Sequence, residues 1–246
     1  GINSDEDIVT YLHDQNPDIM DHLTICVDVA HGHLEGCIQK VKSLRERWGS
    51  NLKIIAGNVA TPRGYLDLCD AGASVVKVSI GSGSACSTRV ITGHGLPLLS
   101  SIILISETRK VCNYTQPIIA DGGMRNSGDI VKALAAGADA VMLGRLLSGC
   151  IESPGRIIDG KKLYRGQSSQ HFLDSIGKDT VAPEGVNMSI PVRGYVQDVI
   201  KNLVGGIKSG MSYTGAHNLE ELRQAATFIE ITPNGYIEGT PHGLHN

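Results

Sequence analysis

The chain has 246 residues, of which 41% are hydrophobic and 19% are charged, and its formal net charge is −3. This composition is ordinary for a globular protein of one or two domains and excludes a disordered or fibrous chain. No cluster of lysine and arginine runs along any segment, so we expect no nucleic-acid partner, whereas small anionic ligands remain compatible with the sequence.

No apolar stretch reaches the roughly 18–20 residues that a membrane-spanning helix needs, so we expect no membrane partner. The six cysteines share no CxxC spacing, and no signal peptide precedes them; they are residues 26, 37, 69, 86, 112 and 150. We therefore expect free thiols and a reducing, cytoplasmic location. His31 and His33 have no third ligand at a compatible spacing and do not indicate a zinc site.

Five short apolar runs, each followed by polar residues or glycine, predict parallel strands. In chain order they are Leu23–Val29, Leu52–Gly57, Ser74–Ile80, Gln116–Ala120 and Ala140–Leu143. The helices before the third and fifth strands end alike, around Gly72 and Gly137, and a glycine suits a helix C-cap. Repeated βα units of this kind favour a (β/α)8 barrel over a doubly wound sheet. Since a barrel needs eight strands, we expect strands 4 to 8 here, with three βα units ahead of Gly1.

About a hundred residues follow the fifth strand, too many for one closing helix and a tail. We interpret residues 145–195 as a flap or nucleotide-binding loop inserted within one catalytic barrel domain that spans residues 1–246. Helices are expected from about Val196 to Gly210 and from Leu219 to Ala226, and the last twenty residues are expected to be irregular.

The glycine-rich loop Gly81–Arg89 directly follows the third strand and contains a single cysteine, Cys86. Barrel enzymes carry their catalytic residues at the carboxyl ends of strands, and glycines let a backbone turn tightly next to a ligand. The loop therefore predicts that Cys86 is a nucleophile. The alternative is a buried, inert cysteine.

Several motifs together resemble the IMP dehydrogenase and GMP reductase family, in the family's order and with similar spacing over nearly the whole chain. They are Gly57–Thr61, Gly81–Arg89, Thr92–Gly93, Asp121–Gly123, Gly128–Ile130 and Tyr164–Gly166. The resemblance implies a (β/α)8 barrel, a homotetramer and a purine nucleoside monophosphate as substrate. The family's first three strands have no counterpart in this sequence.

The resemblance also implies a catalytic set. Cys86 would attack C2 of the purine as a thiolate and form a covalent thioimidate, and Thr88 and Glu184 match the proton donors of the reductases. Backbone carbonyls of Gly81, Gly83 and Cys86 would bind a monovalent cation, K⁺ in the family. Glu238–Gly239 resembles the tail that completes this cation site from a neighbouring subunit.

Nucleotide-binding residues follow from the same resemblance. Asp121 would accept hydrogen bonds from the ribose hydroxyls, although Asp121–Gly123 is also compatible with a simple turn. The other predicted substrate-binding residues are Ser84, Gly123, Gly144, Arg145, Tyr164, Gly166, Gln167 and Ser168. Arg145 departs from the family, which usually has a small residue there. Asp28, Ala30 and Asn58 match positions on the cofactor side, and Asp28 is equally compatible with a helix cap.

Two reactions share the thioimidate. IMP dehydrogenase oxidises IMP with NAD and hydrolyses the intermediate with an Arg–Tyr pair on its flap, whereas GMP reductase expels ammonia from GMP and reduces the intermediate with NADPH. Because residues Ser168 to Glu184 contain neither Arg nor Tyr, we predict a GMP reductase. IMP dehydrogenase and a non-catalytic relative that binds purine nucleotides remain the alternatives.

Overall fold

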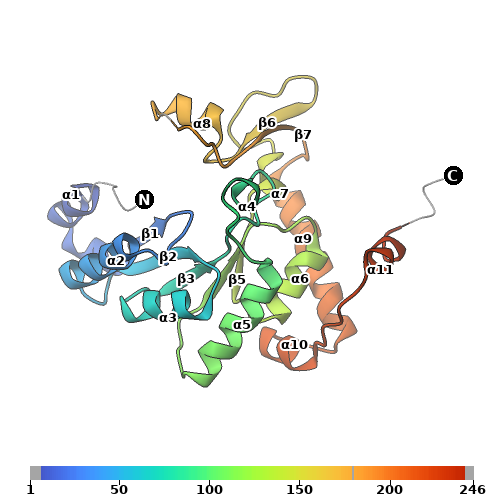
Figure 1. The fold of residues 1–246 in the computed structure, drawn as a ribbon, viewed down its shortest axis with the longest axis horizontal. Coiled ribbons are helices and arrows are strands. Elements are labelled where there is room, and N and C mark those ends of the chain that lie inside the picture. The colour runs from blue at the N-terminus through green and yellow to red at the C-terminus, as the bar shows by residue number, and fades with distance from the viewer. Residues whose placement is uncertain (1–6, 179, 242–246) are drawn as a thin grey trace.

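The computed structural model describes residues 7–178 and 180–241. At its centre is a parallel sheet with the strand order β1-β2-β3-β4-β5 (Figure 1). The strands are β1 (Thr24–Asp28), β2 (Lys53–Val59), β3 (Val75–Val78), β4 (Ile118–Asp121) and β5 (Ala140–Met142). All five predicted strands are present, and each pairs in parallel with the next one along the chain.

The helices between the strands form one layer on one face of the sheet. They are α2 (Glu35–Trp48), α3 (Pro62–Asp70), α5 (Leu98–Val111) and α6 (Ser127–Ala135). Neighbours in this layer contact each other in turn, α2 with α3, α3 with α5 and α5 with α6. A doubly wound sheet would carry helices on both faces, so the arrangement is that of an arc of a (β/α)8 barrel.

The strands are buried on the side of the helices and open on the other side. Ile54 and Ala56 of β2 are fully buried against the helical layer, whereas Cys26 in β1 and Met142 in β5 are exposed. Within the described part of the chain, β1 and β5 are the edges of the sheet, so these residues do not close a barrel. The exposed inner face is the one that the further strands of a barrel cover.

Two helices end in the same glycine-based cap, as the sequence predicts. Gly72 has φ +101° and follows α3, and Gly137 has φ +114° and follows α6. The amide after each glycine donates to a carbonyl five residues back, Ala73 to Leu68 and Ala138 to Ala133. This cap satisfies the last carbonyls of the helix and directs the chain into the next strand.

The region after β5 contains a β-hairpin that stands apart from the main sheet, at the top of Figure 1. Its antiparallel strands are β6 (Lys161–Arg165) and β7 (Asn187–Pro191), with α8 (Gln170–Ser175) between them. The short helices α4 (Thr88–Thr92) and α7 (Arg145–Ser148) lie between this hairpin and the sheet. The division of residues 1–246 into one domain with an insert at 145–195 stays a prediction.

Two expectations for the C-terminal part were wrong in detail. Helix α9 (Val196–Tyr213) continues past Gly210, because this glycine lies within the contact with α6: a Cβ there would be 2.8 Å from Val131 Cγ2. The last twenty residues are not wholly irregular, since α11 (Pro233–Glu238) begins at a Thr232 cap followed by proline.

The remaining elements are α1 (Asp7–Gln15), a 3₁₀ turn η1 (Pro17–Asp21) and α10 (Leu219–Ala225), the last of which matches its prediction to within one residue. Residues 242–246 lie outside the described part. No helix in residues 7–178 or 180–241 combines the length and apolar character that crossing a bilayer requires.

Candidate active site

Arg89 holds the cysteine loop at the carboxyl end of β3. Its guanidinium donates to the carbonyl of Ile80 (3.0 Å), to Ser82 Oγ (3.0 Å) and to the carbonyl of Leu96. A Cβ at Gly81 would lie 2.5 Å from Arg89 Cγ, so a side chain at position 81 would displace the arginine. The Gly81–Arg89 motif alone indicates no role for Arg89. Arg89 fixes the loop that carries Cys86.

Three predicted catalytic residues form a continuous chain of hydrogen bonds. The exposed Cys86 thiol donates to Thr88 Oγ1 (3.1 Å), and the Thr88 hydroxyl donates to Glu184 Oε2 (2.7 Å). Glu184 lies 96 residues from Thr88 along the sequence. The chain joins a carboxylate to the predicted nucleophile through one hydroxyl and is suited to moving a proton near Cys86.

Backbone contacts bring Glu184 to the cysteine loop. The amide of Ser87 donates to the carbonyl of Glu184 (3.0 Å), and the amide of Val186 donates to the carbonyl of Ala85 (2.8 Å). The contact has no room for a side chain at Gly185, whose added Cβ would lie 2.9 Å from the amide nitrogen of Ser169.

Gly166 meets the same junction, because its added Cβ would lie 2.9 Å from the carbonyl oxygen of Ala85. The next two predicted substrate-binding residues, Gln167 and Ser168, are exposed on the turn that leaves β6. Ser169 is 1% exposed and caps α8. Glycines therefore let three backbone segments, around residues 85, 166 and 185, meet at one point.

The Asp121–Gly123 turn packs directly on the cysteine loop. Both glycines have positive φ, +75° at Gly122 and +76° at Gly123. An added Cβ at Gly122 would lie 3.3 Å from Gly83 Cα, and one at Gly123 would lie 3.1 Å from the carbonyl oxygen of Ser82. The predicted ribose-binding turn and the predicted nucleophile loop are thus adjacent. Ser84 is exposed on the latter loop.

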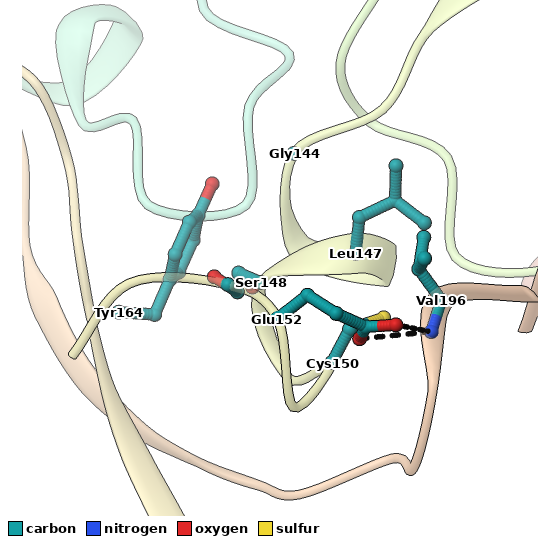
Figure 2. Close-up of a pocket in the computed structure, with 8 residues that line it drawn as sticks. Gly144, Leu147, Ser148, Cys150, Glu152, Tyr164 and Val196 are labelled. Atoms are coloured by element: carbon teal, nitrogen blue, oxygen red, sulfur yellow. Dashed lines mark hydrogen bonds between the residues drawn. The ribbon is translucent and has the colours of Figure 1, made fainter. Parts of the chain in front are cut away.

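Gly144 and Tyr164 lie together beside a hollow of about 430 Å³. Figure 2 shows the side chains around it, from α7, from β6 and from the start of α9. The lining residues are Gly144, Leu147, Ser148, Cys150, Glu152, Ser153, Tyr164 and Val196. A Cβ at Gly144 would be 3.0 Å from Tyr164 Oη, so only glycine leaves the tyrosine hydroxyl in place.

One end of this hollow is already occupied by a carboxylate. Both Glu152 oxygens accept from the amide of Val196, at 3.1 and 3.0 Å, as the dashed lines in Figure 2 mark. A negative charge at the N-terminus of α9 is stabilising. Arg145 at the start of α7 is exposed, and within the described residues its side chain forms no hydrogen bond or ion pair, so its charge is available to a ligand.

A buried lysine joins the predicted cofactor side to the predicted ribose side. Lys77 is 1% exposed, and its Nζ lies 2.7 Å from Asp28 Oδ1 and 3.1 Å from Asp121 Oδ2. Asn58 Nδ2 donates to the same Asp121 oxygen (2.9 Å). Burial lowers the pKa of the Lys77 ammonium, but the hydrogen bond to Asp28 and the nearby Asp121 outweigh it, and the net pKa is raised.

The sequence analysis did not single out Lys77. A signal was available, because a lysine within an apolar parallel strand is costly to bury unless it is paired. Asn58 Oδ1 is buried and accepts no hydrogen bond from the described residues, so a ligand donor would satisfy it. Ala30, the third predicted cofactor residue, lies exposed in the turn after β1.

No group of three or more His, Cys, Asp or Glu side chains within the described ranges is arranged to bind a metal ion. The predicted cation ligands are of another kind, namely the carbonyl oxygens of Gly81, Gly83 and Cys86, which lie on one short loop. Hard oxygen donors of this kind suit an alkali cation.

Residues 3–242 match the model of the IMP dehydrogenase / GMP reductase domain. The chain belongs to the IMP dehydrogenase / GMP reductase family. An inosine-5′-monophosphate dehydrogenase from Halalkalibacterium halodurans is 45% identical over 99% of this chain and 51% of its own length. One from Methanocaldococcus jannaschii is 42% identical over 89% of this chain and 48% of its own length.

A crystal structure of a variant GMP reductase from Trypanosoma brucei in complex with guanosine 5′-monophosphate has a TM-score of 0.83 to this family member. The two sequences are 40% identical over 89% of this chain and 47% of the other. The chain spans about half the length of the relatives that it matches. The family's oxidoreductases act on purine nucleotides with a nicotinamide cofactor, and the sheet corresponds to part of their barrel.

Proposed function

We propose that the protein is a GMP reductase, which converts GMP to IMP and ammonia at the expense of NADPH. The observation that carries the proposal is the hydrogen-bonded chain from Cys86 through Thr88 to Glu184. It places a proton carrier beside the nucleophile, whereas residues 168–184 contain no Arg–Tyr pair that would activate water. The crystallised GMP reductase that it resembles binds GMP.

The reaction begins when the Cys86 thiol passes its proton through Thr88 to the Glu184 carboxylate and the resulting thiolate adds to C2 of GMP. Ammonia leaves only after the 2-amino group gains a proton, which Glu184 supplies through Thr88. Loss of ammonia leaves a thioimidate in which C2 is bound to Cys86 Sγ. A bound nicotinamide cofactor would supply the hydride that C2 needs. Cleavage of the C2–S bond then returns its electron pair to Cys86 Sγ and releases IMP.

The residues present fit the implied ligands. Asn58 Oδ1 is a buried acceptor suited to an amide or hydroxyl donor of the cofactor. Asp121 precedes the two glycines that pack on the cysteine loop and would accept hydrogen bonds from the ribose hydroxyls. Tyr164, Ser84 and Arg145, with the backbone at Gly123 and Gly144, would hold the phosphate. A K⁺ ion would bind to the carbonyls of Gly81, Gly83 and Cys86.

The assembly and location belong to the same proposal. We infer a homotetramer from the family resemblance, and a cytoplasmic location from the free thiols of all six cysteines.

IMP dehydrogenase is the second candidate, and the names of the relatives at 45% and 42% identity favour it. Its reaction would oxidise IMP with NAD at the same cysteine and then needs a base for water. A non-catalytic nucleotide-binding relative is the third candidate, and the intact chain of Cys86, Thr88 and Glu184 argues against it.

The deciding experiment follows the absorbance of the cofactor in the full-length protein, with GMP plus NADPH and, in parallel, IMP plus NAD. Loss of NADPH that depends on GMP supports the reductase, and formation of NADH from IMP supports the dehydrogenase instead. A Cys86→Ser variant is the control and should lose either activity. If the cofactor absorbance changes in neither assay while the protein still binds nucleotide, the result would support the non-catalytic relative.

A further inference from the structure

Lys77 and Lys162 are both buried lysines, but their partners differ. Lys162 is 2% exposed, and its Nζ donates only to main-chain carbonyls, those of Cys150 (2.7 Å), Ile151 (3.0 Å) and Ser153 (2.5 Å). Those contacts hold the loop of residues 150–153 in place. The ammonium of Lys77, on β3, instead bonds to two carboxylates, one on the adjacent strand β4 and one on β1, which lies beyond β2.

Strand register explains why these groups meet. Lys77 pairs with Gly57 of β2 on one side, and Gly57 pairs in turn with Asp28 of β1. A Cβ at Gly57 would lie 2.6 Å from the Cβ of Lys77, so the glycine leaves room for the Lys77 side chain next to β2. On the other side Asp121 ends β4, the next strand. The lysine therefore reaches across β2 to Asp28 on one side and contacts Asp121 on the adjacent strand β4 on the other.

Both carboxylates are partly open to solvent, since the side chain of Asp28 is 43% exposed and that of Asp121 is 20% exposed. Each therefore keeps lone pairs that a ligand can use, while the ammonium between them is shielded from water. The carboxylates of Asp28 and Asp121 repel each other, and the positive charge of the Lys77 ammonium between them offsets this repulsion. Because both carboxylates bind the same ammonium, the position of each one depends on the presence of the other.

We propose that Lys77 is a positioning residue that couples the nucleotide site to the cofactor site, by holding the ribose-side Asp121 and the cofactor-side Asp28 on one buried ammonium. This inference rests on the proposed function, because it assigns the two carboxylates to the two ligands. Neither Lys77 nor its role as the link follows from the motifs of the sequence. Its effect on each ligand passes through Asp28 or Asp121.

The test is a cycle of variants in the full-length protein, Lys77→Met, Asp28→Asn and the double variant, with GMP and IMP binding measured by calorimetry without cofactor. Lys77→Met removes the charge and keeps an unbranched side chain that is one atom shorter. We expect it to weaken nucleotide binding about tenfold, since Asp28 then repels Asp121. Adding Asp28→Asn should restore most of this loss, although Asp28 lies on the cofactor side.

Lys162→Met is the matched control, because it removes a lysine of similar burial that contacts no carboxylate. Whatever it does to nucleotide binding, adding Asp28→Asn should leave that effect unchanged. If Lys77→Met does not fold, Lys77→Gln with and without Asp28→Asn replaces it, and the same rescue is expected. The KM for the cofactor should rise in every variant that lacks Lys77, and adding Asp28→Asn should not lower it again.

Absence of rescue, with the Lys77 variants folded, would overturn the coupling and leave the lysine a structural residue. Normal nucleotide binding in the Lys77 variants would do the same. If the wild-type protein binds neither GMP nor IMP, the proposed function fails and the coupling fails with it. Titration of the wild-type protein with GMP and IMP therefore distinguishes failure of the proposed function from failure of the coupling alone.

Discussion

At the scale of single residues, the proposed reaction assigns proton transfer to the Glu184 carboxylate, which is linked to Cys86 through the Thr88 hydroxyl. Glu184→Gln keeps the size of the side chain and removes the group that exchanges a proton with Thr88, whose hydroxyl lies 2.7 Å away. We expect kcat for ammonia release from GMP to fall about a hundredfold, since positioned proton transfer contributes on that order. Rapid-quench measurement of ammonia in a single turnover checks this.

The control for this variant is Glu107→Gln, an exposed carboxylate on the outer helix α5. It should turn over GMP at the wild-type rate, and both variants should bind GMP with unchanged affinity. An unchanged rate of ammonia release in Glu184→Gln would remove Glu184 from the proton path.

At the scale of elements, the flap hairpin is placed by close backbone contact. Gly185 has no left-handed φ, so Gly185→Ala acts through its Cβ, which would lie 2.9 Å from the Ser169 amide. The segment that carries Glu184 must then move relative to Cys86. We expect kcat to fall about a hundredfold, because a misplacement near 1 Å has that effect, while thermal stability changes little.

Gly205→Ala is the matched control for the same substitution, since a Cβ there meets nothing within 4 Å in helix α9. It should keep full activity, because helices tolerate alanine better than glycine. Steady-state kinetics and melting curves of both variants compare them directly. If Gly185→Ala were as active as Gly205→Ala, tight docking of the flap would not be needed for catalysis.

The sequence predicted the strands better than it predicted the flap, and for a physical reason. Apolar runs such as Ser74–Ile80 report burial, which is a local property of parallel strands. The meeting of Ala85, Gly166 and Gly185 depends instead on segments up to a hundred residues apart. Family motifs supplied Cys86, Thr88 and Glu184 as candidates, and the structure showed their contact.

Lys77 was missed for a related reason. In the sequence, Lys77 is a single charged residue within an apolar run and has no evident partner. The register of β1, β2 and β3 places Asp28 near it. The same limit applied to Arg89, which bonds to Ile80, Ser82 and Leu96 across a loop whose path the sequence does not define. For buried charged residues, therefore, the structure supplies the interaction partners that the sequence does not show.

At the scale of the whole molecule, Asp139 joins three elements of the barrel arc. Its carboxylate accepts from Arg109 in α5 (2.5 Å), from Arg223 in α10 (2.9 Å) and from the amide of Ile118 in β4 (2.8 Å). Burial raises the pKa of Asp139, but the Ile118 amide and the Arg109 guanidinium outweigh it, so the net pKa lies below the usual value.

Asp139→Asn should therefore destabilise the fold by about 1.5–3 kcal/mol at pH 7, the range for hydrogen bonds to a charged group. Because the folded pKa is lowered, this contribution is complete above the unfolded value of about 4 and is lost as the pH falls through the folded value. The difference in free energy of unfolding between wild type and Asp139→Asn should thus shrink below about pH 4, as urea titrations would show. Asp21→Asn, at an exposed position, should differ little from wild type at either pH. A difference for Asp139→Asn that stayed constant with pH would mean that the shape of the side chain, and not its charge, holds α5, α10 and β4 together.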